Sequence, residues 1–311
     1  MAFMGFTAVL SNLGQIRQNF RIAQEALLKE QPDVLILIDY PSFNLRIASF
    51  CRKHLSRTKI VYYIPPKVWA WKKRRVHAIA RLCDKVLGIF PFEPAFYAKY
   101  GYTCQYVGHP TVENILPKLQ KSRQTRTIAI LPGSRPSEIT HCLPRMLEAA
   151  RRYPNFTISV CAAPSIEDSF YTPYLHKGEI LTRDTYGTLQ AAAAALVNSG
   201  TATLETALLG CPQVAVYHIA CSGLLKCLRL LKPWVFTIPY FTPVNIVENK
   251  EIIKECIAYD FTIEEVAAEL ERILMDETYK KKMLASYKHL LSTLGSQSAS
   301  IAAAEIITSI Q

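Results

Sequence analysis

The stretch "DVLILIDYPSFNLRIASFCRKHLSRTKIVYYI", residues 33–64, places a helical pattern between two short apolar runs. The runs Asp33–Asp39 and Lys59–Ile64 are nearly continuous in Val, Ile, Leu and Tyr. Such runs are typical of parallel strands that are covered on both faces. Residues 45–55 between them have the wider apolar spacing of a helix. The stretch therefore predicts a β-α-β unit, the repeating element of a doubly wound parallel sheet.

The same alternation continues on both sides of this stretch. We expect further strands at Lys85–Phe90 and Cys104–Gly108, and helices at Leu10–Lys29, Arg74–Cys83 and Glu93–Tyr100. The polar segment "KLQKSRQTR", residues 118–126, then interrupts the rhythm without an apolar run and predicts a linker.

Beyond this linker the alternation resumes. We expect strands at Thr127–Leu131, Phe156–Val160, Ala194–Asn198 and Gln213–Tyr217, and helices near Ile139–Tyr153, Ser165–Leu175 and Ala202–Leu209. From Thr262 onward the pattern is helical and contains no strand. The fold class is therefore α/β with two Rossmann-like lobes, and the predicted domains are residues 1–120, 121–261 and 262–311.

Composition limits the class of protein. At 311 residues the chain exceeds the usual size of one domain, and its 50% hydrophobic content suits packed cores and argues against disorder. The longest apolar runs fall far short of the roughly 20 residues of a membrane-spanning helix. The N-terminus has no signal-peptide pattern, and nine cysteines without a C-x-x-C pair indicate reduced, mostly buried thiols in a cytosol.

A net charge of +11 favours an anionic partner, which could be nucleic acid, anionic lipid or a phosphate-bearing ligand. Two segments combine cations with apolar side chains: "YYIPPKVWAWKKRRV", residues 62–76, and "SGLLKCLRLLKPWVF", residues 222–236. Either one alone is explained by a core-packed helix with a solvated basic edge. Together they favour contact with an anionic lipid surface. The contact residues expected are Trp69, Trp71, Lys72, Lys73, Arg74, Arg75, Lys226, Arg229, Lys232 and Trp234.

Two loops of the second half have the composition of anion sites. In "ILPGSRPSE", residues 130–138, a Pro-Gly turn and a serine precede a helix, and Arg135 adds a permanent charge. In "NSGTATLE", residues 198–205, small side chains allow close approach of the backbone to a phosphate, and Glu205 follows one helical turn past Thr201. Each loop alone could be an ordinary capped helix start. Two of them at carboxyl ends of strands favour a phosphate-bearing ligand.

Asp39 ends the first strand at the carboxyl edge of its sheet. A carboxylate there could be a general base, a metal ligand or a helix N-cap. No D-x-D pair occurs in the chain, so we expect no metal. His109 follows a later strand, and a lone histidine there favours a structural role.

These blocks, together with "AFMGFTAVL" (2–10), "FPFEPAFY" (90–97), "VGHP" (107–110) and "NIVENKEIIKE" (245–255), occur in an order that resembles the lipid A disaccharide synthase family. The resemblance covers essentially the whole chain. It implies an inverting glycosyltransferase of the GT-B type, with two lobes facing a cleft. It also implies a reaction in which UDP-2,3-diacylglucosamine and 2,3-diacylglucosamine 1-phosphate give a β-1,6-linked disaccharide and UDP.

The resemblance further implies a setting and partners. The family serves lipopolysaccharide synthesis in Gram-negative bacteria, as peripheral proteins on the cytosolic face of the inner membrane. The UDP-sugar is a substrate, no cofactor or metal is expected, and relatives suggest a homodimer with an exchanged C-terminal segment. Nucleic acid is not expected, because the cations are concentrated at a few places rather than laid along a groove.

The resemblance also assigns roles by position. Asp39 corresponds to the general base on the acceptor hydroxyl, and Glu205 to the ribose ligand. The other expected UDP-binding residues are Arg135, Glu138, Ser199, Gly200, Thr201, Thr203, Asn245, Glu251 and Glu255.

The family begins with a strand, a G-E-x-S-G-D-type loop and a helix, whereas this sequence opens at "AFMGF". We therefore expect an incomplete N-terminal lobe, little product from this chain alone and product from a version extended upstream in frame. The alternatives are another UDP-sugar enzyme of the same fold, such as a 2-epimerase or a different transferase, and an inactive remnant of the family.

Overall fold

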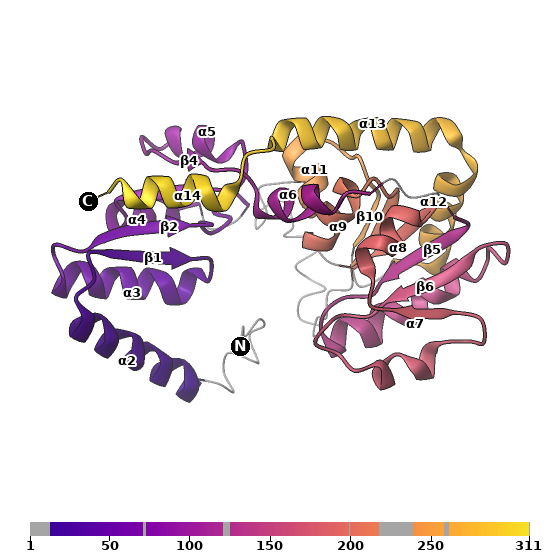
Figure 1. Ribbon diagram of the computed structural model, residues 1–311, viewed down its shortest axis with the longest axis horizontal. Coiled ribbons are helices and arrows are strands. Elements are labelled where there is room, and N and C mark those ends of the chain that lie inside the picture. Colours follow the sequence, from indigo (N-terminus) through magenta and orange to yellow (C-terminus); the bar gives the residue numbers. More distant parts are fainter. Residues whose placement is uncertain are drawn as a thin grey trace. The chain divides into compact units, whose positions relative to one another are not determined.

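The computed structural model describes residues 13–70, 73–120, 125–198, 200–217, 239–257 and 261–310. The chain divides into two compact units, shown with their elements in Figure 1. The first unit contains Met1–Gly108 and Ser298–Gln311, and the second contains His109–Gln297.

The first unit is built on a parallel four-stranded sheet in the order β1-β2-β3-β4. The strands are β1 (Val34–Ile38), β2 (Lys59–Tyr63), β3 (Lys85–Gly88) and β4 (Gln105–Tyr106). The helices are α2 (Leu13–Glu30), α3 (Pro41–His54), α4 (Arg75–Leu82), α5 (Glu93–Ala98) and α14 (Ala299–Thr308). The β-α-β unit predicted from residues 33–64 is confirmed.

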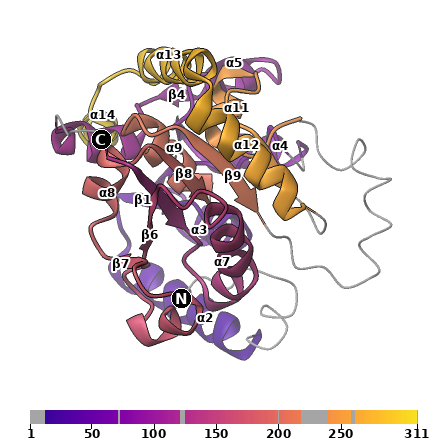
Figure 2. The ribbon, with the colours of Figure 1, turned by 90° about the vertical axis from the view of Figure 1, so that its right-hand side faces the viewer.

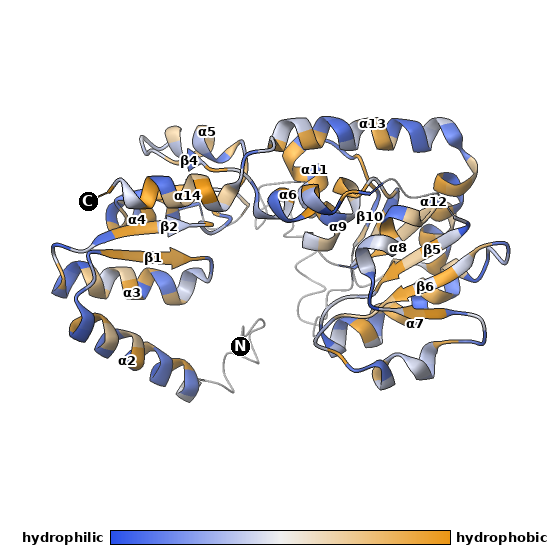
Figure 3. Cartoon of the chain, in the orientation of Figure 1, coloured by the Kyte–Doolittle hydropathy of each residue, from blue (hydrophilic) through white to orange (hydrophobic). Residues whose placement is uncertain are grey.

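The two faces of this sheet have separate cores. Leu37, Ile60 and Tyr62 lie in one core with α3 and α4. Val61 and Leu87, which point to the opposite face because side chains alternate along a strand, pack with α14. Figure 1 shows α3 and α14 on opposite sides of β1 and β2, and Figure 3 shows both strands as hydrophobic.

The second unit contains a parallel six-stranded sheet in the order β10-β9-β8-β5-β6-β7. Its strands are β5 (Thr127–Leu131), β6 (Thr157–Cys161), β7 (Ile180–Thr182), β8 (Ala194–Val197), β9 (Gln213–Tyr217) and β10 (Glu255–Ile257). The chain proceeds from β5 to one side, and then returns to place β8 on the other side of β5. This reversal is a topological switch point, where ligands of open α/β sheets bind.

Helices cover both faces of the second sheet. Its helices are α6 (Pro110–Ile115), α7 (Pro136–Ala150), α8 (Thr185–Ala191), α9 (Gly200–Leu208), α11 (Pro243–Glu248), α12 (Ile263–Met275) and α13 (Glu277–Leu294). Helices α7 and α12 pack together on one face, and α8 and α9 contact strands on the other (Figure 2). The strands between them supply fully buried side chains such as Ile128, Ile130 and Leu196. Burial on both faces explains their continuous apolar sequences.

The unit boundaries differ from those expected from the linker. Helix α6 lies before residue 118, yet its Val112 and Ile115 belong to the core of the second unit. The helical C-terminal region, predicted correctly as helical, is not one segment. Helices α12 and α13 pack with the second unit, whereas α14 belongs to the first.

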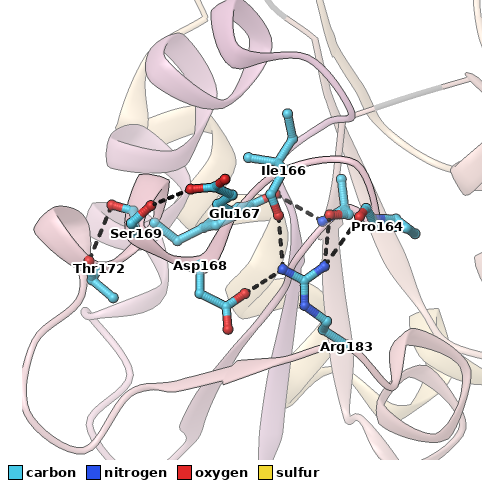
Figure 4. A network of polar contacts seen from close by, with 9 residues as sticks. Pro164, Ile166, Glu167, Asp168, Ser169, Thr172 and Arg183 are labelled. Atoms are coloured by element: carbon cyan, nitrogen blue, oxygen red, sulfur yellow. Dashed lines mark hydrogen bonds and ion pairs between the residues drawn. The ribbon is translucent and has the colours of Figure 1, made fainter.

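The helix predicted near Ser165–Leu175 is wrong. Only two short 3₁₀ turns form there, Asp168–Phe170 and Thr172–Tyr174. The guanidinium of Arg183 donates hydrogen bonds to the carbonyl oxygens of Ala163 and Ile166 and pairs with Asp168 (Figure 4). The carbonyl oxygen of Ile166 thus accepts from Arg183, and the N–H of Phe170, four residues later, donates to Glu167 instead, as in a 3₁₀ turn.

Two general expectations hold within the described ranges. All seven described cysteines are buried thiols, and burial raises the pKa of Cys83 and of Cys161 to about 12. None of the described helices combines the length and the apolar content required to cross a bilayer.

Candidate functional site

The two predicted anion loops of the second unit flank the switch point. One follows β5 and the other follows β8, and these strands are neighbours in the sheet. The side-chain amide of Asn198 donates a hydrogen bond of 2.8 Å to the carbonyl oxygen of Pro132. Asn198 is only 2% exposed, so this bond is shielded from water. Asn198 ties the two loops together, a role that was not predicted from the sequence.

The loop after β5 has a backbone that only glycine adopts easily. Gly133 has φ +119°, and a Cβ there would lie 2.7 Å from the Cβ of Glu138. The carboxylate of Glu138 accepts hydrogen bonds from the backbone N–H of Ser134 (3.0 Å) and from Nη1 of Arg135 (2.6 Å). Glu138 therefore holds the loop and orients Arg135 at the first turn of α7. In this structure the carboxylate of Glu138 is therefore bonded to the loop and already has partners within the protein.

Helix α9 begins at Gly200, at the end of the second loop. Thr201 is exposed there, whereas Thr203 is buried and its hydroxyl donates to the carbonyl oxygen of Gly200 (2.7 Å). Thr201 is thus accessible to a ligand, whereas the hydroxyl of Thr203 is used in a hydrogen bond within the helix. Ser199 lies outside the described residues. The partial positive charge of the helix N-terminus favours an anion at this position.

Glu205, the predicted ribose ligand, is half-buried on α9. Its Oε1 accepts a hydrogen bond of 3.2 Å from the hydroxyl of Tyr186 on α8. Burial raises the pKa of Glu205, although the hydrogen bond from Tyr186 opposes this change. The side chain therefore already has a protein partner.

Asn245 and Glu255, both expected to bind UDP, are joined to each other at the start of α11. Oε1 of Glu255 accepts hydrogen bonds from the N–H (2.8 Å) and hydroxyl (2.7 Å) of Thr242 and from the amide of Asn245 (2.9 Å). Asn245 is fully buried, and its Oδ1 accepts from the backbone N–H groups of Ile252 and Ile253. These residues fix α11 against β10, so their observed role is to build the wall of the site.

The third predicted residue of this block lies apart. Glu251 is exposed and pairs only distantly with Lys254, at 3.9 Å. The start of α11 is nevertheless close to the start of α9, because a Cβ at Gly200 would lie 3.8 Å from Cδ of Pro243. Burial and the charge of Glu138 raise the pKa of Tyr217 at the carboxyl end of β9, and the charge of Arg135 opposes this change.

In the first unit, Asp39 follows β1 in a strained backbone conformation. Asp39, Tyr40 and Ile64 have φ values of 48°, 39° and 56°, in the left-handed region that side chains rarely adopt. The carbonyl oxygen of Asp39 accepts hydrogen bonds from the hydroxyl of Tyr62 (2.8 Å) and the amide of Asn44 (2.6 Å). Backbone strain maintained by surrounding contacts is common at functional sites.

The carboxylate of Asp39 is exposed at the carboxyl edge of the sheet. The N-cap of α3 is Tyr40, and no side chain makes a cap hydrogen bond there. The reading of Asp39 as a helix cap is therefore excluded within the described residues. Its side chain forms no hydrogen bond or ion pair with any residue that the structure describes, so it is accessible to a ligand.

Trp69, expected at a lipid surface, is instead internal. It is 5% exposed and packs edge-on to the rings of Phe90 and Phe92, with centroids 5.6 and 4.9 Å away. Its Nε1 donates to Oε1 of Glu93 (3.1 Å). The aromatic side chain is thus covered by its own unit, which corrects the prediction of a lipid contact for this residue.

Glu93 is the buried acceptor of this cluster and was not singled out from the sequence. Besides Trp69, it accepts backbone N–H bonds from Ile89 (2.8 Å) and Phe90 (3.0 Å) through Oε2. Burial raises its pKa to about 7, and these three hydrogen bonds oppose that change. A Cβ at Gly88 would lie 2.6 Å from Oε2, so glycine is required beside it.

The remaining predicted lipid contacts divide between two groups. Lys73 and Arg74 are exposed, and Arg75 is half-exposed at the start of α4. The others lie outside the described residues: Trp71, Lys72, Lys226, Arg229, Lys232 and Trp234. His109 has a structural role, since it is buried and its Nδ1 accepts from the N–H of Thr111 at the start of α6.

None of the described His, Cys, Asp and Glu side chains forms a group of three that could hold a metal ion. The absence of a metal from the reaction stays a prediction.

Two parallel-sheet units, one with two loops of anion-site composition at its switch point, have the architecture of the GT-B fold class. Solved structures agree. A putative UDP-N-acetylglucosamine 2-epimerase from Listeria monocytogenes has a TM-score of 0.59 at 10% identity, over 96% of this chain and 79% of that chain. UDP-GlcNAc 2-epimerase from Neisseria meningitidis, bound to UDP-GlcNAc, has a TM-score of 0.55 at 10% identity, over 99% and 83%. At such low identity they show the fold alone.

Sequence comparison gives the family. A family model described as lipid-A-disaccharide synthetase matches residues 1–308. The lipid-A-disaccharide synthases of Geobacter sulfurreducens and Anaeromyxobacter dehalogenans (strain 2CP-C) are 33% and 34% identical, over 99% and 100% of this chain and 83% and 84% of theirs. The chain belongs to the lipid-A-disaccharide synthetase family. The resemblance inferred from the motifs is thereby confirmed, and nothing in these comparisons favours the epimerase alternative.

Proposed function

We propose that this chain transfers 2,3-diacylglucosamine from UDP to 2,3-diacylglucosamine 1-phosphate, forming the β-1,6 disaccharide of lipid A and releasing UDP. The observation that carries the proposal is the pair of loops tied by Asn198 and Pro132 at the switch point, in a chain of this family. The loops present backbone N–H groups and Arg135 where a diphosphate can bind.

The second unit would bind the donor and stabilise the leaving group. Negative charge develops on the diphosphate as the bond to the sugar breaks. The N-terminus of α9 and the guanidinium of Arg135 can stabilise that charge without rearranging, because Glu138 already holds Arg135 at 2.6 Å. Asn245 and Glu255 support this site by fixing α11, and Glu205 is proposed to meet the ribose.

The first unit would activate the acceptor. Asp39 is proposed to accept the proton of the acceptor hydroxyl while the oxygen attacks the anomeric carbon of the donor and UDP departs. Attack opposite the leaving group inverts the configuration at that carbon. An accessible carboxylate on a fixed backbone suits a general base, because the proton must be reached in one defined orientation.

We also propose that the protein works at the cytosolic face of the inner membrane without crossing it, as a homodimer. The membrane location is supported by the net charge of +11 and by the exposed Lys73 and Arg74, whereas the homodimer rests on the family resemblance alone. Acylated, phosphorylated substrates reside in a bilayer, and cations near its surface gain from anionic lipid.

The test is an assay with UDP-2,3-diacylglucosamine and 2,3-diacylglucosamine 1-phosphate. We expect disaccharide and UDP in equal amounts, and only when both substrates are present. An epimerase would instead convert a UDP-sugar without an acceptor. Failure to make disaccharide, in a sample that is folded by circular dichroism, would reject the proposal.

A further inference from the structure

A basic pocket on α4 has no part in the reaction proposed above. It has a volume of about 500 Å³ and is lined by Arg74, His77, Ala78, Ala80, Arg81 and Tyr102. Arg74, His77 and Arg81 are spaced by three and four positions, so they share one face of the helix. The opposite face, Val76 and Ile79, is fully buried in the core of the first unit. The pocket therefore stands on a firmly packed helix.

The charge of this pocket is positive and unbalanced. Arg74 and Arg81 are exposed, and neither forms an ion pair with a carboxylate in the described part of the chain. No acidic side chain is among the residues that line the pocket. Lys73 adds a further exposed cation just before the helix. A guanidinium that lacks a protein carboxylate can form paired hydrogen bonds with a phosphate.

The aromatic wall of the pocket is ordered by contacts of its own. Nδ1 of His77 lies 3.1 Å from the hydroxyl of Tyr102. The imidazole also stands edge-on to Tyr100 and Tyr102, with ring centroids 5.6 and 5.7 Å away. These contacts fix the wall before a ligand arrives, which lowers the entropic cost of binding.

We propose that this pocket binds the phosphate headgroup of an anionic phospholipid at the bilayer surface. Two arginines of matched spacing supply the phosphate recognition, and tyrosine is a residue of the membrane–water interface, where one end is apolar and the other wet. The choice of a bilayer over free phosphate rests on the proposed function, since acylated substrates reach the enzyme from a membrane.

The experiment is co-sedimentation with phosphatidylcholine vesicles that contain or lack one quarter phosphatidylglycerol. The pocket variant is Arg74→Gln with Arg81→Gln, and the matched control is Lys281→Gln with Lys282→Gln, which removes the same charge from exposed positions of α13. Since each cation near an anionic surface is worth about fivefold in affinity, we expect the pocket variant to bind about 30-fold more weakly. The control should lose less than about threefold. Equal losses in the two variants would overturn the proposal.

A second variant separates a shaped pocket from a simple cluster of charge. Tyr102→Phe removes the hydroxyl beside His77 without changing the net charge, and we expect it to weaken vesicle binding measurably, by about threefold. Unchanged binding would reject the pocket. Because the two guanidiniums recognise phosphate, inorganic phosphate should displace the wild-type protein from vesicles better than chloride at equal ionic strength, but should not do so for the pocket variant. Equal displacement of the wild-type protein by the two anions would reject phosphate recognition. Equal binding to vesicles with and without phosphatidylglycerol would mean that the anionic headgroup is not the ligand.

Failure of this inference can be distinguished from failure of the proposed function. UDP binding is measured by calorimetry on the same variants, because its proposed site lies on loops of the second unit, apart from the pocket residues. If the wild-type chain does not bind UDP, the proposed function fails, whatever the vesicles show. If UDP binds and the vesicle results go against expectation, this inference alone fails.

Discussion

Replacing Glu93 by glutamine should remove a pH dependence from the stability of the first unit. Glu93 is 1% exposed and accepts hydrogen bonds from Trp69, Ile89 and Phe90. Its pKa is raised from 4.5 to about 7, because burial disfavours the charged form more than the three donors favour it. The folded protein therefore keeps a proton on Glu93 over a pH range in which the unfolded chain has lost it.

The sign and size of this pH dependence follow from the linkage between proton binding and folding. Between pH 4.5 and about 7 the folded state binds more protons than the unfolded state, so the free energy of unfolding falls as pH rises. The stabilisation is complete below 4.5 and is lost as pH passes through about 7. At 1.36 kcal/mol for each pKa unit, the free energy of unfolding should drop by about 2.5 kcal/mol from pH 5 to pH 8. Glu93→Gln carries no titrating group and should show none of this drop.

The assay is urea unfolding at pH 5, 6, 7 and 8, followed by the fluorescence of Trp69 with Trp71 and Trp234 replaced by phenylalanine. This signal reports on the first unit, which matters because two compact units can unfold separately. The control is Glu30→Gln, an exposed residue of the same unit, which should track the wild-type profile. The reasoning is refuted if Glu93→Gln and the control have the same slope between pH 5 and pH 8.

Three other substitutions, one of them with a matched control, test the site. Asp39→Asn should reduce turnover at least about 100-fold with UDP affinity unchanged by calorimetry, and normal turnover would remove it as the base. Gly133→Ala should destabilise the second unit by about 1–3 kcal/mol in urea and weaken UDP binding, because of its positive φ and the contact with Glu138. Gly210→Ala, also at positive φ but with open space around it, should leave UDP binding intact. Asn245→Leu strands two buried N–H groups and should cost about 1–3 kcal/mol for each, so a change below about 0.5 kcal/mol would contradict the wall role.

Continuous apolar runs predicted the strands well. β5 and β9 have the bounds expected from sequence, Thr127–Leu131 and Gln213–Tyr217, because both are covered by helices on each face. β7 and β10 were missed, since each has three residues and no apolar run of its own. The segment Ser165–Leu175 contains residues of low helix propensity, among them Thr172 and Pro173, and its contacts with Arg183 decide its conformation.

The site was predictable where its signal is local. The two loops at the switch point were found from their glycines and small residues, and Asp39 from its place at a strand end. The bond from Asn198 to Pro132 joins residues 66 positions apart, and that from Trp69 to Glu93 joins residues 24 apart. No local pattern reports such pairs. A sequence with an aromatic residue next to cations does not indicate whether the aromatic ring is buried or exposed. For this reason the prediction of a lipid contact for Trp69 was wrong.

Helix α14 belongs to the first unit but is synthesised last, so the first unit cannot complete its fold until the whole chain has been made. Ala303 and its neighbours complete a core that also contains Val61 and Leu87, more than 200 residues earlier in the chain. During translation the second unit emerges whole, while the first still lacks one of its layers until the ribosome has released the last turn of α14. A premature stop codon just before Ala299 would therefore damage the part of the protein that is made first.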